Sequence, residues 1–199
     1  YNIIAESQEY TVVAEFDHVA TPAEAYQSEA DLEKEFIRLL GEQGYEYLPI
    51  HKEADLIFNL RDQLEKLNHY HFTDNEWEHF FNECIANKND DIVAKTAKIQ
   101  DDYIQVLKRD TGESQNIKLI DKDNIHNNFV QVINQYVEEG GNYDTRYDVS
   151  ILVNGLPLVH IELKRRGVQL KEAFNQINRY QRDSFWAGCG LYELSLIHI

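Results

Sequence analysis

The first part of the chain has a pattern of apolar residues that predicts a short strand followed by a helix. Residues Tyr10–Phe16 alternate weakly between apolar and polar, which favours a strand. Helix-start signals follow at Thr21-Pro22-Ala23-Glu24 and again at Ser28-Glu29-Ala30-Asp31. Apolar residues then recur at helical spacing (Leu32, Phe36, Leu39, Leu40) until Gly41 and Gly44. We predict a helix over Ser28–Glu42.

The segment Ala54–Lys98 is polar, with apolar residues at helical intervals. These apolar residues are Leu56, Leu60, Leu64 and Leu67, and later Trp77, Phe80 and Phe81. We predict a small helical insertion, about residues 54–98, that covers an edge of the core. Three histidines in or near this stretch, His69, His71 and His79, lack the spacing of metal ligands, and we expect them to be solvated.

Two strand signals then surround a turn, and a third follows. Tyr103–Leu107 and Ile117–Ile120 flank Asp110-Thr111-Gly112 and predict a hairpin. Phe129–Val137 predicts a strand that the sequence Glu138-Glu139-Gly140-Gly141-Asn142 ends. One of its faces would carry Phe129, Gln131, Ile133 and Gln135, and the other Val130, Val132, Asn134 and Tyr136.

The strongest strand signals are Tyr147–Val153 and Leu158–Lys164, separated by Asn154-Gly155-Leu156-Pro157. Each strand has one apolar face, and the charged residues Asp148, Glu162 and Lys164 fall on the other, which we expect to be solvated. A lysine-containing helix, Val168–Arg182, is predicted to follow.

The pairing of these two strands decides whether the charged side chains meet. A plain two-residue turn at Asn154-Gly155 would pair Asp148 with Ile161 and place the carboxylates of Asp148 and Glu162 on opposite faces. A three-residue loop, or a bulge near Pro157, pairs Asp148 with Glu162 instead. Because Pro157 lacks an N–H and favours an irregularity, we predict the second register.

Two neighbouring carboxylates and a lysine form a chemically distinctive group. The carboxylates repel each other unless a cation lies between them, and oxygen ligands suit Mg²⁺ first and Mn²⁺ second. The ammonium group of Lys164 could orient a water molecule or stabilise charge on a phosphorus centre. The alternative is an ordinary solvated strand face that carries a Glu–Lys pair.

Composition limits the possible partners. The 199 residues have a net charge of −16, which repels nucleic acid, but Ile161–Asp183 holds six Lys or Arg against three Asp or Glu. Within it, Arg165 and Arg166 could contact phosphates without reading sequence. The chain shows no membrane-spanning run, no secretory signal and no cysteine framework, since Cys84 and Cys189 lie far apart. We therefore expect a cytoplasmic protein.

The residues around these strands resemble a known family. Tyr147-Asp148-Val149, the run Asn154–Arg165 and Ala173-Phe174-Asn175-Gln176-Ile177-Asn178-Arg179-Tyr180 are similar to the N-terminal nuclease domain of type I restriction enzyme restriction (R) subunits, in the PD-(D/E)xK nuclease superfamily. The resemblance is dense over Arg146–Ala187 and fainter over Ser28–Leu48. Tyr147 departs from the proline of the superfamily motif, at a position that shapes the backbone and is not a ligand.

The resemblance implies roles for individual residues. Asp148 and Glu162 match the metal-binding carboxylates, Lys164 matches the catalytic lysine, and the Leu163 backbone carbonyl would complete the metal shell. Gln176 and Tyr180 match a Gln-x-x-x-Tyr motif and share one face of the following helix, from which they could orient DNA or the catalytic residues. The alternative for that pair is a polar helix face.

The first helix of the superfamily often adds a glutamate to the metal site. On a helical wheel Glu29 falls near the middle of the stripe formed by Leu32, Phe36 and Leu40, and Glu33 falls at its edge. We favour Glu29 as a metal ligand, with Glu33 second. The alternative is that both are solvated.

Together, these features predict an α/β fold: a restriction-endonuclease-like core with a central mixed β-sheet flanked by helices, plus the helical insertion. Residues 1–199 would form one nuclease domain with its catalytic hairpin and following helix at 146–182, as a fragment of a longer, motor-containing subunit. The tail Leu191–Ile199 diverges from the family pattern, and we expect truncation or a non-native read-through there.

The function predicted is Mg²⁺-dependent cleavage of double-stranded DNA in an ATP-dependent type I restriction enzyme, with modification and specificity subunits as partners. ATP would serve the full subunit, since this chain has no P-loop motif. The alternatives are a catalytically silent DNA-binding or docking module, and another PD-(D/E)xK nuclease.

Overall fold

The computed structural model of the chain describes residues 2–6, 12–15, 28–138, 145–164, 171, 175 and 197–198. Its first two strands, β1 (Asn2–Glu6) and β2 (Val12–Glu15), pair antiparallel. The strand predicted over Tyr10–Phe16 is thus present as β2. Its partner β1 was not predicted, because five residues are too few to show a clear period.

Helix α1 spans Glu29–Glu42 and confirms the predicted helix. Ser28 is its N-cap, and the Ser28 side chain accepts a hydrogen bond from the backbone N–H of Asp31 at 3.1 Å. The helix ends before Gly44, whose φ of +93° a residue with a side chain rarely adopts. The other predicted start, at Thr21, lies outside the described residues.

The segment predicted to be helical does form helices. They are α2 (Glu53–Asn68), α3 (Asp74–Phe80), the π-helix η1 (Phe81–Ile85) and α4 (Ile92–Gln100). In the predicted apolar stripe of α2, Leu56, Leu60 and Leu64 are fully buried, and Leu67 is partly buried. These helices were expected to cover an edge of the core, but their apolar residues form much of the core itself.

A separate antiparallel hairpin confirms the prediction around Asp110-Thr111-Gly112. It consists of β4 (Ile104–Lys108) and β5 (Ser114–Lys118), whose inward residues Leu107 and Ile117 are buried. The short 3-10 helix η2 (Ile125–Asn127) then leads toward the central sheet.

The central sheet has five strands in the order β3-β6-β7-β8-β9. Their bounds are β3 (Glu46–Tyr47), β6 (Val130–Glu138), β7 (Thr145–Val153), β8 (Leu156–Ile161) and β9 (Ile197–His198). The β6–β7 and β7–β8 pairs are antiparallel, and the outer pairs β3–β6 and β8–β9 are parallel. The predicted mixed α/β fold is therefore confirmed.

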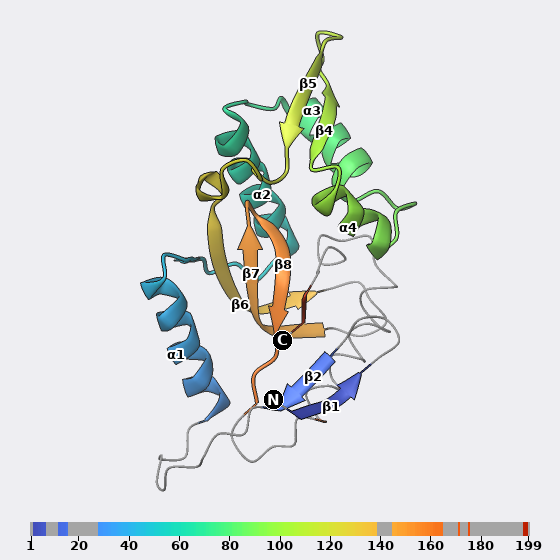
Figure 1. Cartoon of the computed structure of the whole chain (residues 1–199). Helices are drawn as coiled ribbons and strands as arrows, with labels where there is room; N and C mark the ends of the chain where they lie inside the picture. Colours follow the sequence, from blue (N-terminus) through green and yellow to red (C-terminus); the bar gives the residue numbers. More distant parts are fainter. Residues whose placement is uncertain are drawn as a thin grey trace, which may run out of the picture.

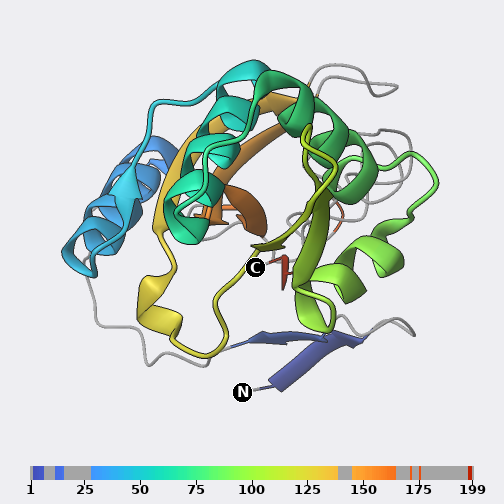
Figure 2. The ribbon, with the colours of Figure 1, turned by 90° about the horizontal axis from the view of Figure 1, so that it is seen from above.

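Helices lie against both faces of this sheet (Figure 1). On one face Leu40 of α1 packs with Val132, Val149 and Ile161 in a small core. On the other face α2, α3 and the β4–β5 hairpin contribute to a larger core. The view from above shows α1 and α2 on different sides of β6 (Figure 2). The middle of the sheet is therefore shielded from water on both sides.

Candidate active site

The register of β7 and β8 brings the two candidate carboxylates together. Val149 pairs with Ile161 in the last pair of the β7–β8 ladder, so Asp148 and Glu162 are the next residues along the two chains. Nearer the turn, Leu152 pairs with Pro157, so the register shifts by one residue between Ile151 and Leu152. The bulge predicted near Pro157 is thus confirmed, although the turn itself is the two-residue Asn154-Gly155.

Both residues of the Asn154-Gly155 turn contact neighbouring parts of the fold. Both residues have positive φ values, 52° and 81°, as a tight hairpin turn requires. The buried Asn154 side chain donates to the Leu119 carbonyl at 3.0 Å and accepts from the Phe129 N–H at 2.9 Å. Gly155 lies directly against the backbone of Leu60 in α2. The hairpin that carries the site is therefore anchored at its turn.

The alternation of faces reverses along β6 at Gln135. Val132 packs in the small core, whereas Tyr136, four residues later, packs in the large core. Strict alternation would place both on one face. Gln135 has a left-handed φ of 51°, which accounts for the reversal. The two faces predicted for Phe129–Val137 therefore hold only as far as Asn134.

Strand β7 reverses at the same level, at Asp148. Tyr147 packs in the large core and Val149 in the small core, although strict alternation would place them on one face. Asn134 pairs with Val149 and Tyr136 with Tyr147, so Gln135 and Asp148 lie opposite each other between these pairs. Asp148 therefore occupies a local distortion of the sheet.

Asp148, Glu162 and Lys164 meet at the end of β8. The Leu163 N–H donates to Asp148 Oδ2 at 2.9 Å, and Lys164 Nζ donates to Glu162 Oε1. This face was expected to be solvated, but Asp148, Glu162 and Lys164 are only partly exposed. The side chain of Glu162 is 4% exposed and that of Lys164 is 19% exposed.

Burial changes the acid–base properties of these groups. Burial and the neighbouring Asp148 carboxyl, which also shares a hydrogen bond with Glu162, raise the pKa of Glu162 against the opposing effect of Lys164. Burial works against the charge of Lys164, but Glu162, Asp148 and Glu29 together raise its pKa. Lys164 thus stays charged and partly neutralises the two carboxyl groups.

The two glutamates of α1 behave differently. Glu29, at the start of the helix, lies close enough to Lys164 to raise its pKa. Glu33, one turn later, instead accepts hydrogen bonds from Asn134 and Gln135 in β6. The charge of Glu29 therefore acts on Lys164, and the role of Glu29 as a metal ligand stays a prediction.

The structure shows a neighbour of the site that sequence reasoning missed. His160 Nδ1 lies 2.8 Å from Ser150 Oγ, and the His160 ring stacks on Tyr147 with centroids 4.5 Å apart. All three side chains are buried. Tyr147 and Ser150 lie within two residues of Asp148 in β7, and His160 lies in the adjoining strand β8. The polar residues Ser150 and His160, among the apolar residues that flank them in the two strands, were the available signal.

The donor set fits a small divalent cation. Asp148 and Glu162 supply two adjacent carboxylates, and Mg²⁺ typically takes one or two carboxylates and fills its remaining positions with water or phosphate oxygens. Across the described ranges no three His, Cys, Asp or Glu side chains converge closely enough to hold a metal ion. The predicted contribution of Glu29 to the metal site stays a prediction.

Several predicted site residues cannot be placed. Arg165, Arg166, Gln176 and Tyr180 lie outside the described residues, as does most of the predicted helix Val168–Arg182. Their assignments stay predictions.

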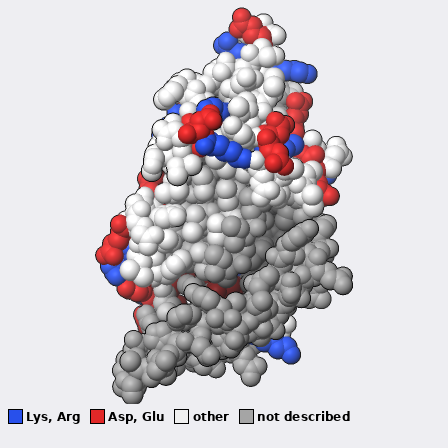
Figure 3. All heavy atoms as spheres, viewed as in Figure 1, with Lys and Arg blue, Asp and Glu red and all other residues white. Residues whose placement is uncertain are grey.

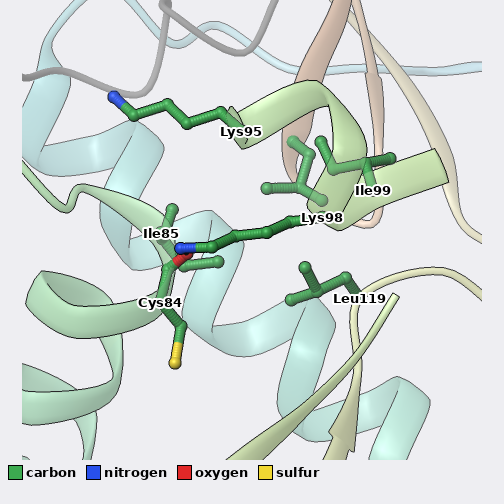
Figure 4. A pocket seen from close by; sticks show the side chains of 7 residues that line it. Cys84, Ile85, Lys95, Lys98, Ile99 and Leu119 are labelled. Atoms are coloured by element: carbon green, nitrogen blue, oxygen red, sulfur yellow. The ribbon is translucent and has the colours of Figure 1, made fainter. Parts of the chain in front are cut away.

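A small cavity lies elsewhere in the protein, where α4 meets the hairpin side of the core. Seven residues line it: Cys84, Ile85, Lys95, Lys98, Ile99, Leu119 and Leu156. Lys98 reaches the Cys84 carbonyl at 3.2 Å, and Lys95 points away from it (Figure 4). None of the candidate active-site residues lines this cavity.

On the surface, acidic and basic side chains lie next to each other along α1 and at the hairpin end of the molecule (Figure 3). Among the helices in the described part of the chain, none is long and apolar enough to cross a membrane.

The fold and the site define a mixed α/β domain with two partly buried carboxylates and a lysine at the end of a central strand. Comparison with known families then identifies the class further. A family model described as the N terminus of the type I restriction enzyme R protein matches residues 26–199. The chain belongs to this family, as the resemblance implied.

Individual relatives agree with this assignment. The chain is 48% identical over 183 residues to the Escherichia coli "Type I restriction enzyme EcoprrI endonuclease subunit", which covers 92% of the chain. It is 39% identical over 165 residues, 80% of the chain, to the Staphylococcus saprophyticus "Type I restriction enzyme SsaAORF53P endonuclease subunit". The chain spans 58% of the length of the first relative and 17% of the second.

Proposed function

We propose that this chain is the endonuclease part of a type I restriction enzyme R subunit and hydrolyses phosphodiester bonds of double-stranded DNA with Mg²⁺. The observation that carries the proposal is the meeting of three charged side chains where the β7–β8 ladder ends: Asp148 accepts a hydrogen bond from the Leu163 N–H, and Lys164 donates one to Glu162. Membership of the R-protein family and relatives named endonuclease subunits support it.

Each residue has a chemical role in this proposal. Asp148, Glu162 and the Leu163 carbonyl would hold the ion, with Glu29 as a further candidate ligand. A bound Mg²⁺ would supply Lewis-acid stabilisation of the phosphate and a more acidic water. Lys164, kept cationic by its acidic neighbours, orients the attacking water or neutralises charge that develops on the phosphate.

Further parts of the proposal concern DNA and the other subunits. Arg165 and Arg166 contact DNA phosphates, and Gln176 and Tyr180 orient the DNA or the catalytic residues. The net charge of −16 opposes DNA binding by this chain alone. The substrate is therefore delivered within a complex, by an ATP-driven motor in the same subunit and by modification and specificity subunits.

The test is DNA cleavage by the full complex carrying Asp148→Asn, Glu162→Gln or Lys164→Ala. We expect cleavage to fall at least about a hundredfold, because each variant removes a charge that acts on the reacting phosphate or on its cation. ATP hydrolysis should continue at the normal rate. Cleavage would be measured as linearisation of a plasmid that carries recognition sites, at several Mg²⁺ concentrations.

The matched controls are Asp62→Asn and Lys66→Ala, which remove an exposed acid–lysine pair on α2. They should cleave normally. If the three site variants cleave as well as the controls do, the assignment of the site is wrong. If the unsubstituted complex hydrolyses ATP but does not cut DNA with Mg²⁺ or Mn²⁺, the domain is instead a silent docking or DNA-binding module.

A further inference from the structure

Glu33 joins helix α1 to the central sheet through both of its carboxylate oxygens. Oε1 accepts a hydrogen bond from Asn134 Nδ2 at 2.6 Å, and Oε2 accepts one from Gln135 Nε2. Asn134 also accepts a hydrogen bond from the Tyr47 hydroxyl at 2.9 Å, which ties strand β3 into the same group. A single carboxylate thus connects α1 to two adjacent residues of β6.

This connection matters because apolar packing holds only the second half of α1. The α1 residues in the small core are Phe36, Ile37 and Leu40. In the described structure no α1 residue before Phe36 belongs to that core. In the first half of the helix, Glu33 supplies two hydrogen bonds to the sheet.

The Glu33 contact also lies where the alternation of faces reverses in β6 and β7. Gln135 has a φ of 51°, a conformation that costs a residue with a side chain about 1 kcal/mol. Gln135 lies opposite Asp148 in the β6–β7 pair. The Glu33 carboxylate bonds the Gln135 side chain, so it stabilises the backbone conformation that faces the candidate catalytic aspartate.

We propose that Glu33 is a positioning residue. Its bonds to Asn134 and Gln135, which we call the clamp, hold α1 against β6 where the Gln135 backbone is left-handed. The clamp thereby keeps Asp148 near Glu162 and Glu29 near Lys164. The inference rests on the proposed function. It assigns Glu33 a role distinct from metal binding, since amide donors already engage both of its oxygens. Glu29 lies one helical turn earlier on the same side of α1, so the clamp sets its position as well.

The test is Glu33→Gln in the R subunit of the assembled complex. In this variant an NH₂ group replaces one carboxylate oxygen and faces the side-chain NH₂ group of Asn134 or Gln135. Because both groups are donors, one of the two hydrogen bonds is lost. We expect the cleavage rate to fall about ten- to a hundredfold and the Mg²⁺ concentration for half-maximal cleavage to rise, as for residues that orient metal ligands. Mg²⁺ affinity, measured by calorimetry without DNA, should fall in parallel.

The control on the same helix is Glu35→Gln, which removes an exposed partner of Arg38 and should change neither quantity. A second background, Asn134→Ala with Gln135→Gly, removes both donors while glycine keeps the left-handed turn. In that background Glu33→Gln should have no further effect, because the bonds that it breaks are already absent.

Two results would overturn the clamp. One is an unchanged Mg²⁺ affinity in Glu33→Gln. The other is a loss of cleavage on adding Glu33→Gln to Asn134→Ala/Gln135→Gly that is as large as the loss in the unsubstituted protein. Glu162→Gln, measured in parallel, separates this inference from the proposed function. If Glu162→Gln is inactive while Glu33→Gln is normal, only the clamp is wrong. If Glu162→Gln cleaves normally, the proposed nuclease site itself fails.

Discussion

Gly155 is the point at which the candidate active-site hairpin comes closest to helix α2. A Cβ atom at this position would lie 2.6 Å from the Cα of Leu60, and the φ of Gly155 is +81°. Neither the helix backbone nor the two-residue turn can easily move, because Leu60 is buried and Asn154 is bonded on both sides. Glycine is therefore required here by space as well as by backbone conformation.

Gly155→Ala should lower the free energy of unfolding by about 2–4 kcal/mol, since a steric overlap adds to the cost of the left-handed conformation. The matched control is Gly112→Ala in the β4–β5 turn. Gly112 has a similar φ of +87° but nothing within 4 Å of its Cβ position, so only about 1 kcal/mol should be lost there. Urea unfolding would measure both values, and equal losses would contradict the close approach.

At the scale of elements, helix α3 is joined to the β4–β5 hairpin through one buried carboxylate. Glu76 accepts hydrogen bonds from the Thr73 N–H at 3.0 Å, the Tyr70 hydroxyl at 2.8 Å and the Asp110 N–H at 3.1 Å. The first bond completes a capping box with Thr73. Glu76 thus holds the helix start and the hairpin turn together.

The Glu76 contacts predict a pH dependence of stability. Burial alone would raise the pKa of Glu76, but the hydrogen bonds from Thr73, Tyr70 and Asp110 outweigh it and lower the pKa. A carboxyl group with a lowered pKa in the folded state stabilises fully above its unfolded pKa of about 4.3. That contribution is lost as the pH falls from about 5 through the folded pKa.

Glu76→Gln should therefore destabilise the protein by about 1–3 kcal/mol at pH 7 and have less effect near pH 3. Unfolding by urea at pH 7, 5 and 3 would measure the difference. Glu78→Gln, on the exposed side of the same helix, is the control and should show little effect at any pH. A Glu76→Gln effect that is the same at all three pH values would contradict the role of the charged form.

At the scale of the whole molecule, helices and hairpin enclose the sheet from both sides, and the Glu162 side chain at the end of the sheet is 4% exposed. The two partly buried carboxyl groups lie in a chain with a net charge of −16, and Lys164 bonds one of them. A divalent ion bound there would reduce the remaining repulsion. Binding to the folded state alone also stabilises that state by mass action.

Mg²⁺ at about ten times its dissociation constant should therefore raise the unfolding temperature by about 3–6 °C. Asp148→Asn should abolish this increase, because it removes one of the two carboxylates. Asp62→Asn, on the exposed face of α2, should leave the increase intact. Thermal unfolding in Mg²⁺ and in equal ionic strength of KCl would measure the effect, and an identical increase in all three proteins would exclude a specific site.

Local signals in the sequence predicted much of the fold and the pairing of the site. The cap at Ser28, the turn at Asp110-Thr111-Gly112 and the bulge near Pro157 each depend on residues a few positions apart. The sequence predicted that Asp148 and Glu162 meet, because Pro157 cannot donate to the ladder and shifts the register. Its preference for Glu29 over Glu33 as a metal ligand stays a prediction.

Only the tertiary structure decided how far the candidate site is exposed to solvent and which residues support it. The sequence pattern of β7 and β8 shows one apolar face, and it does not show that α1 and α2 cover both faces of the sheet. The left-handed Gln135 and its bond to Glu33 join residues about a hundred positions apart, a separation that no local period encodes. The sequence by itself determined how β7 and β8 pair, because the register of a hairpin follows from the local backbone rules of its turn and bulge. Their burial and support were decided by packing between distant elements, because that depends on how the whole chain closes around the sheet.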